Sequence, residues 1–168
     1  LGLREVTSEL LRTTLGYLTD RVAGRLRAAG RAGRTITVRV RFANLRSVTR
    51  SLTLASAISA TLTMTEIAIE LARAALDDHP DERRISLLAV SVSQLVEQSA
   101  LQLELPLELT DVARRPGTVA GAARWSADRS VDAIRTRFGR AAIGYASVMF
   151  ADADHVPDAF RELAEHDP

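Results

Sequence analysis

The sequence predicts an α+β fold in which helices cover one face of an antiparallel sheet and leave the other face open to water. Three observations lead to this prediction. A long segment near the start repeats apolar residues every three or four positions, the period of an amphipathic helix. Later segments alternate apolar and polar residues, the period of a half-buried strand. The resulting order of helix, strand, strand, helix and strand is typical of an open α+β sandwich.

The first helix is expected over residues 3–26, where the apolar residues form one stripe. Thr7 or Ser8 is a candidate N-cap, and Gly30 and Gly33 are candidate stop signals. A strand follows over 35–42, with an apolar side made of Ile36, Val38, Val40 and Phe42. Its polar side carries two hydroxyls and two guanidinium groups, from Thr35, Thr37, Arg39 and Arg41.

A second strand is expected over 48–54, joined to the first by a short antiparallel hairpin link at 43–46. Thr49 and Ser51 lie on one of its faces and Arg50 on the other. Residues 63–66 have the spacing of a capping box and predict the start of a second helix that ends before Pro80. Residues 85–95 predict a third strand, with Leu88, Val90 and Val92 facing inward.

The organisation changes after this strand. We predict one domain over residues 1–100, a separate short peptide at 101–107, a linker at 108–129 and a helical tail at 130–168. Ser130 is a candidate N-cap of the tail helix, and Gly139 a position at which that helix breaks or bends. Six acidic residues against one arginine make the end of the tail a solvated or partner-facing segment.

Composition excludes several functional classes. All 22 basic residues are arginine, so the chain has no lysine for a Schiff base or a Walker motif, and no cysteine supplies a disulfide or a thiol. The three histidines are scattered without metal-ligand spacing, so we expect no metal site and no catalytic residue. No apolar run is long enough for a membrane span and no signal peptide opens the chain; we expect a cytoplasmic, monomeric fragment.

Charge is distributed unevenly along the chain. Residues 1–50 contain 11 arginines and three acids, whereas residues 51–168 contain 11 arginines and 18 acids. This distribution fits either a polyanion partner for one face or a solvated surface whose charges cluster. Hydroxyl and guanidinium groups on one sheet face are the usual donors to phosphate oxygens. Because that face lacks aromatic rings for base stacking, contact with a duplex backbone is favoured over readout of single strands.

Three segments carry a family resemblance. Residues 34–42, 47–54 and 84–93, with a helix between the second and third, resemble the little-finger domain of Y-family translesion DNA polymerases, in particular the bacterial polymerase IV branch. The resemblance implies a βαββαβ sheet domain, so a first strand is expected before residue 1 or in a few truncated residues at the start. It also implies that catalytic carboxylates and magnesium belong to a palm domain outside this chain, so no cofactor is expected in the fragment.

The resemblance further implies that the domain grips primer–template duplex. The residues predicted to contact DNA are Arg34, Thr35, Thr37, Arg39, Arg41, Thr49, Arg50 and Ser51. Arg50 is included because of the family pattern, since alternation alone places it on the opposite face unless a bulge redirects it.

A sliding clamp is the second partner implied, because similar polymerases carry a clamp-binding peptide after the last strand. The candidate anchors here are Gln102, Leu103, Leu105, Pro106 and Leu107. The residue pattern alone favours a satellite strand that packs its leucines on the domain, and the position after the last strand, where similar polymerases carry the peptide, favours clamp binding instead. Two alternatives to a polymerase fragment stay open: a noncatalytic polymerase-like subunit, and an adaptor that docks on the clamp or on other proteins.

Overall fold

The computed structural model describes residues 4–5, 7–82, 84–97 and 119–145. Its elements are β1 (Arg4–Glu5), α1 (Ser8–Ala28), β2 (Arg31–Phe42), β3 (Ser47–Ile58), α2 (Thr61–Asp77), β4 (Arg84–Glu97), α3 (Val119–Phe138) and a 3-10 turn at Arg140–Ala142. The first six follow the order β-α-β-β-α-β. The predicted α+β fold is confirmed, and the truncated first strand is the two-residue β1.

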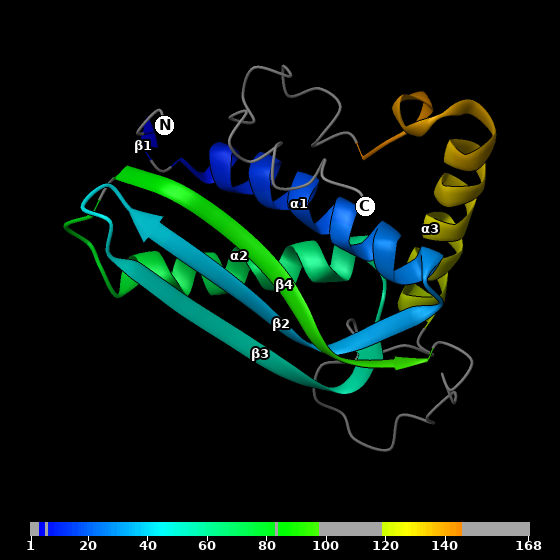
Figure 1. Ribbon diagram of the computed structural model, residues 1–168, viewed down its shortest axis with the longest axis horizontal. Helices are drawn as coiled ribbons and strands as arrows, with labels where there is room; N and C mark the ends of the chain where they lie inside the picture. The colour runs from blue at the N-terminus through cyan, green and yellow to red at the C-terminus, as the bar shows by residue number, and fades with distance from the viewer. Residues whose placement is uncertain (1–3, 6, 83, 98–118, 146–168) are drawn as a thin grey trace.

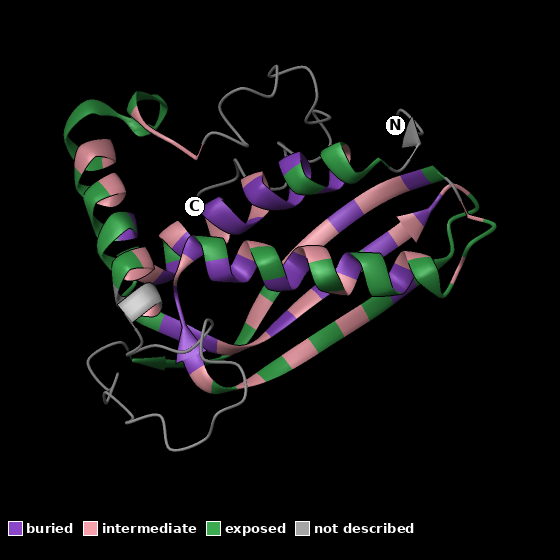
Figure 2. Cartoon of the chain, turned by 180° about the vertical axis from the view of Figure 1, so that it is seen from behind, coloured by how far each residue is buried: buried purple, intermediate pink, exposed green. Residues whose placement is uncertain are grey.

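The sheet has four antiparallel strands in the order β1-β4-β2-β3, so β2 is paired on both edges. Helices α1 and α2 lie on the same face of the sheet, in front of the strands in Figure 2. Helix α3 stands beside the carboxyl end of α1 (Figure 1). None of the helices in the described part of the chain is long and apolar enough to cross a bilayer.

The alternation of apolar and polar residues along β2 determines which of its side chains form the core. Ile36, Val38, Val40 and Phe42 are all 0% exposed and pack under the two helices. Each such side chain contributes about 1.5–3 kcal/mol when it leaves water, so a register slip by one residue would forfeit most of this core. The predicted inward residues of β4 also pack here, Leu88 as a core member and Val90 and Val92 against it.

The predicted signals at the two ends of α1 are confirmed with two corrections. Thr7 is the N-cap, and its hydroxyl accepts a hydrogen bond from the Leu10 amide at 3.0 Å. The helix therefore begins at Ser8 and not near Leu3, because the preceding residues pair with β4. Gly30 follows the helix at φ +62°, a left-handed conformation that glycine adopts at no steric cost. Gly33 is not part of the stop; it lies inside β2.

Two other predicted helix starts are wrong. Helix α2 begins at Thr61, and its N-cap, Ala60, has no side chain that could bond the first turn. The predicted capping box at 63–66 lies inside the helix, where Thr63 is buried. Helix α3 begins at Val119, so residues 119–129 of the predicted linker are helical. Ser130 is not an N-cap, because it lies inside the helix and its hydroxyl donates to the Ser126 carbonyl. At the start of α2, a carboxylate from α3 takes the place of the local cap.

Candidate nucleic-acid interface

The side of the sheet that none of the described helices covers presents a block of twelve side chains, which we call the open face. Directly opposed residues of antiparallel strands point to the same side of a sheet. The four predicted residues of β2 therefore share this side with their partners on β3 and β4. The open face consists of Thr35, Thr37, Arg39 and Arg41 of β2, Ser47, Thr49, Ser51 and Thr53 of β3, and Leu87, Ala89, Ser91 and Ser93 of β4.

The chemistry of this block is uniform. Eight of its twelve side chains carry a hydroxyl and two carry a guanidinium group, and none of the twelve is acidic or aromatic. Most of these side chains are short, so a ligand can approach the strands closely. An array of neutral hydroxyl donors around two fixed positive charges suits phosphate oxygens.

Cross-strand hydrogen bonds hold both arginines against the sheet. The Arg39 Nη2 donates to the Ser47 hydroxyl at 3.3 Å, and the Arg41 Nε donates to the Ser86 hydroxyl at 3.2 Å. Arg39 is exposed and Arg41 half-buried. At the other end of the block, the hydroxyls of Thr35 and Thr53 lie 2.9 Å apart. The two guanidinium groups are therefore positioned before any ligand binds.

Arg50 lies on the opposite side of the sheet. It is paired in register with Val38, which is 0% exposed beneath the helices. The register of β2 and β3 is regular from Thr35 to Arg41, so no bulge turns Arg50 toward the open face. Its guanidinium group forms an ion pair with Asp78, just after the end of α2. The hydrogen bond from Arg50 holds the pKa of Asp78 below its ordinary value.

The other arginines of residues 31–50 are also spread apart. Arg34 lies at the irregularity between Gly33 and Thr35, and its Nε donates to the Leu54 carbonyl at 3.1 Å. Arg31 is opposite Glu97, 3.9 Å away. Arg46 is exposed in the turn between β2 and β3. The dense basic segment of the sequence therefore brings only Arg39 and Arg41 together on the open face.

Alternation along β4 adds Ser91 and Ser93 to the interface, beside Thr37 and Thr35. They are not among the residues predicted to contact DNA, although alternation with the inward-facing Val90 and Val92 turns them outward. Only the strand order, with β4 next to β2, shows that they belong to the same block. Residues 102–107, the predicted clamp-binding peptide, lie outside the described residues.

No metal-ligand cluster was found where the structure is described: no three His, Cys, Asp or Glu side chains there come together in a way that could hold an ion.

Comparisons with known proteins give one consistent result. Residues 2–105 match the family model described as the impB/mucB/samB family C-terminal domain. The chain is 56% identical over 165 residues to DNA polymerase IV 2 of Mesorhizobium japonicum, which covers 98% of this chain and 40% of that protein. It is 31% identical over 129 residues to DNA polymerase IV of Dehalococcoides mccartyi, covering 77% of this chain and 29% of the relative. The chain thus spans less than half the length of these two relatives.

Proposed function

The chain belongs to the impB/mucB/samB C-terminal domain family of the Y-family DNA polymerases, and we propose that it grips the sugar–phosphate backbone of primer–template duplex through its open face. The whole protein would then be a translesion DNA polymerase, with this chain as its DNA-gripping and clamp-docking part. The relatives are both named as DNA polymerases IV, which supports this proposal.

The observation that carries the proposal is the composition of the open face. Two positioned guanidinium groups and eight hydroxyls, with no carboxylate among the twelve side chains, favour a polyanion over a neutral or basic partner. The block offers no ring on which a base could stack, so backbone contact accounts for binding better than base readout. Binding of this kind is independent of sequence, as a polymerase that moves along its template requires.

Salt dependence tests the proposal. Each phosphate contact contributes about 0.9 to the slope of log affinity against log salt for duplex DNA. Arg39→Ala and Arg41→Ala should each reduce this slope by about that amount, and the double variant by about twice as much. Fluorescence anisotropy with a labelled primer–template duplex at several salt concentrations measures this slope. Arg73→Ala is the matched control, because Arg73 is exposed on α2, on the covered side of the sheet.

The double variant decides the outcome. A slope equal to that of the unmodified chain would refute the open face as the DNA-binding surface. An equal loss of slope in Arg73→Ala would show that general positive charge, and not this face, controls binding.

We also propose that residues 102–107 dock on a sliding clamp in an extended conformation. The support is the sequence itself: a glutamine amide that both donates and accepts, followed by Leu103, Leu105 and Leu107 as apolar anchors. Pro106 removes a backbone donor and disfavours a central strand. Burial of one leucine contributes about 1.5–3 kcal/mol, so Gln102→Ala/Leu105→Ala should abolish most of a micromolar affinity.

Titration of a bacterial sliding clamp with both proteins measures this loss. Circular dichroism must first show that the two proteins fold alike. Equal clamp affinity, or a variant that unfolds, would instead assign these leucines to the core of the domain.

A further inference from the structure

Helix α3 touches the rest of the domain through a charged stripe: Arg124, Asp128, Asp132 and Arg135. These residues are four, four and three positions apart and so lie on one face of the helix. Each has a partner of opposite charge on another helix. Arg124 donates two hydrogen bonds to Glu66 of α2, both of 2.8 Å, and Arg135 donates one to Asp20 of α1 at 2.9 Å. The two aspartates bind Arg27 of α1.

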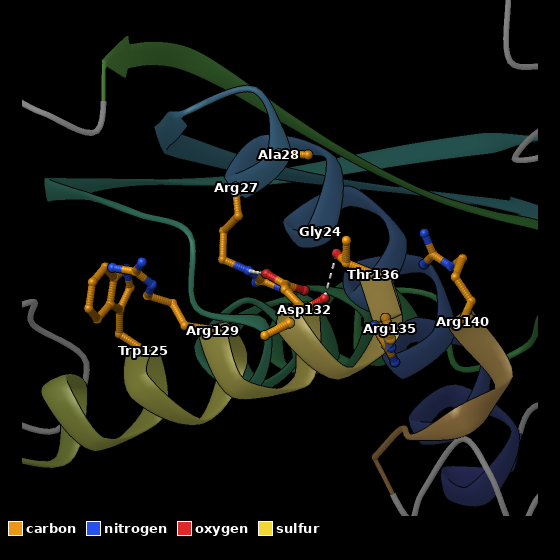
Figure 3. A pocket seen from close by; sticks show the side chains of 10 residues that line it. Gly24, Arg27, Ala28, Trp125, Arg129, Asp132, Arg135, Thr136 and Arg140 are labelled. Atoms are coloured by element: carbon orange, nitrogen blue, oxygen red, sulfur yellow. Dashed lines mark hydrogen bonds and ion pairs between the residues drawn. The ribbon is translucent and has the colours of Figure 1, made fainter. Parts of the chain in front are cut away.

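Arg27 is the centre of this contact. Its side chain is only 5% exposed. Two of its nitrogens donate to the Asp132 carboxylate at 2.5 and 2.9 Å, and its Nη1 donates to the Ser59 carbonyl at 2.8 Å and the Thr61 hydroxyl at 3.0 Å. The guanidinium group therefore links the end of α1, the start of α2 and the middle of α3 (Figure 3).

Asp128 caps the amino end of α2, which the alanine at the N-cap position cannot do. Its carboxylate, 1% exposed, accepts the Thr61 amide hydrogen at 2.8 Å and lies 3.3 Å from Arg27. The Tyr145 hydroxyl donates to its other oxygen. The first amides of a helix carry partial positive charge, so a carboxylate from α3 replaces the cap that Ala60 lacks. We call the Arg27 guanidinium and the amino end of α2 the carboxylate corner.

Helix α3 is joined to the domain differently from α1 and α2. No described residue of α3 belongs to either hydrophobic core cluster. A cleft of about 770 Å³ runs along its contact with α1, lined on the two sides by residues such as Gly24 and Trp125 (Figure 3). Release of α3 would bring the charged stripe into water and would leave both core clusters intact, because no described residue of α3 packs in them. The helix also lies beyond residues 2–105, which match the family domain.

From this arrangement we propose that α3 is a reversibly docked helix, held by the carboxylate corner, and that this corner is a carboxylate-binding site whose ligand in this chain is Asp128. The proposal rests on the α1–α2–α3 contacts and is independent of DNA binding. When Asp128 is removed, the corner keeps its guanidinium group and its helix amides. A small carboxylate from solution then fits the vacated position.

The chain contains its own reporter of docking. Trp125 is its single tryptophan and lies on α3, where its Nε1 is buried without a hydrogen-bond partner among the described residues. Release of α3 brings that nitrogen into water. Tryptophan emission should then move to longer wavelength, and quenching by acrylamide should rise several-fold.

The experiment compares Asp128→Ala with Asp128→Asn and with Asp81→Asn in the full chain. Asp81 is exposed in the turn before β4 and serves as the matched control. Asp128→Ala should show the tryptophan changes and faster hydrogen exchange in peptides from α3, while peptides from β2 stay protected. Acetate, added at the same ionic strength as chloride, should reverse both changes. Asp128→Asn should show smaller changes in emission and exchange, and acetate should not reverse them, because the asparagine amide still fills the carboxylate corner.

Three outcomes would overturn the proposal. If Asp128→Ala leaves emission and exchange in α3 unchanged, Asp128 does not hold the helix. If β2 loses its protection together with α3, the helix is part of the cooperative core and not a docked element. If acetate acts no better than chloride on a variant with released α3, the corner is not a carboxylate site.

Discussion

Arg50 of β3 and Asp78, which follows α2, form an ion pair on the helix-covered side of the sheet. This pair joins the first part of β3 to the carboxyl end of the helix that packs over it. The strand register places Arg50 on the other side of the sheet from the open face, on which Arg39 and Arg41 lie. The arginine that the family pattern alone placed among the DNA contacts therefore has a structural partner of its own.

Removal of the Arg50 side chain should change the pKa of Asp78 and leave DNA binding unchanged. In Arg50→Ala the pKa of Asp78 should rise back toward its ordinary value, because the hydrogen bond that lowers it is lost. A lowered carboxyl pKa contributes stability that is present above the unfolded-state pKa and is lost as pH falls through the folded-state pKa. The difference in free energy of unfolding between Arg50→Ala and the unmodified chain should therefore become smaller at acid pH. NMR titration of the side-chain carboxyl measures the shift. An Arg50→Ala chain whose salt slope falls as much as that of Arg39→Ala would contradict the assignment.

Serine positions on β4 allow a test by gain of function. Ser91 is exposed on the open face opposite Thr37, so Ser91→Arg should raise duplex affinity several-fold at low salt and steepen the salt slope by about 0.9. Ser86→Arg is the contrasting change. The Ser86 hydroxyl donates to the carbonyls of Arg41 and Phe42 at 3.2 and 3.0 Å and accepts from the Arg41 side chain. Its replacement should weaken folding and bring no gain in affinity; similar gains for both variants would contradict the orientation of β4.

Two glycines should respond oppositely to alanine. A Cβ at Gly33 would lie 2.2 Å from the Val92 Cγ1 and 3.2 Å from the Ser93 carbonyl oxygen, so Gly33→Ala should destabilise by about 1–3 kcal/mol. A Cβ at Gly24, inside α1, meets nothing within 4 Å, so Gly24→Ala should stabilise by up to about 1 kcal/mol. Urea unfolding followed by circular dichroism compares the two. Equal effects would contradict the close approach of β2 and β4 at Gly33.

Alkaline pH should reduce the contribution of the Tyr145 hydroxyl to the stability of the fold. Burial raises the pKa of its hydroxyl, and the hydrogen bond to Asp128 and the charge of Asp128 raise it further. A raised folded-state pKa gives stability that is complete below the unfolded-state pKa, about 10, and that is lost as pH rises toward the folded-state value.

Tyr145→Phe should therefore cost about 1–3 kcal/mol at pH 8, because a buried carboxylate loses a donor, and the difference should shrink above pH 10. Urea unfolding monitored by Trp125 emission, which follows α3, measures both values. A difference that stays constant between pH 8 and pH 11 would show that the Tyr145 hydroxyl does not donate to Asp128.

Residue patterns with a short range predicted much of this domain. Alternation in β2 identified the core side through Ile36 and Val38 and the open side through Thr37 and Arg39, because a strand turns successive side chains to opposite faces. The N-cap of α1 was also predictable, since Thr7 bonds an amide only three residues away. The cap of α2 was not, because its carboxylate comes from Asp128, 67 residues along the chain.

The sequence by itself determined the family, the order of elements and the polarity of each strand face, because these follow from periodicity and from local bonds between neighbouring residues. The tertiary structure alone decided that β4 lies beside β2, that Arg50 pairs with Asp78, and that α3 begins at Val119 and binds Arg27 through Asp128 and Asp132. Charged side chains can be satisfied by any opposite charge that the fold brings within reach. Their partners are therefore fixed by the packing of helices and strands, and a linear pattern of residues does not contain that information.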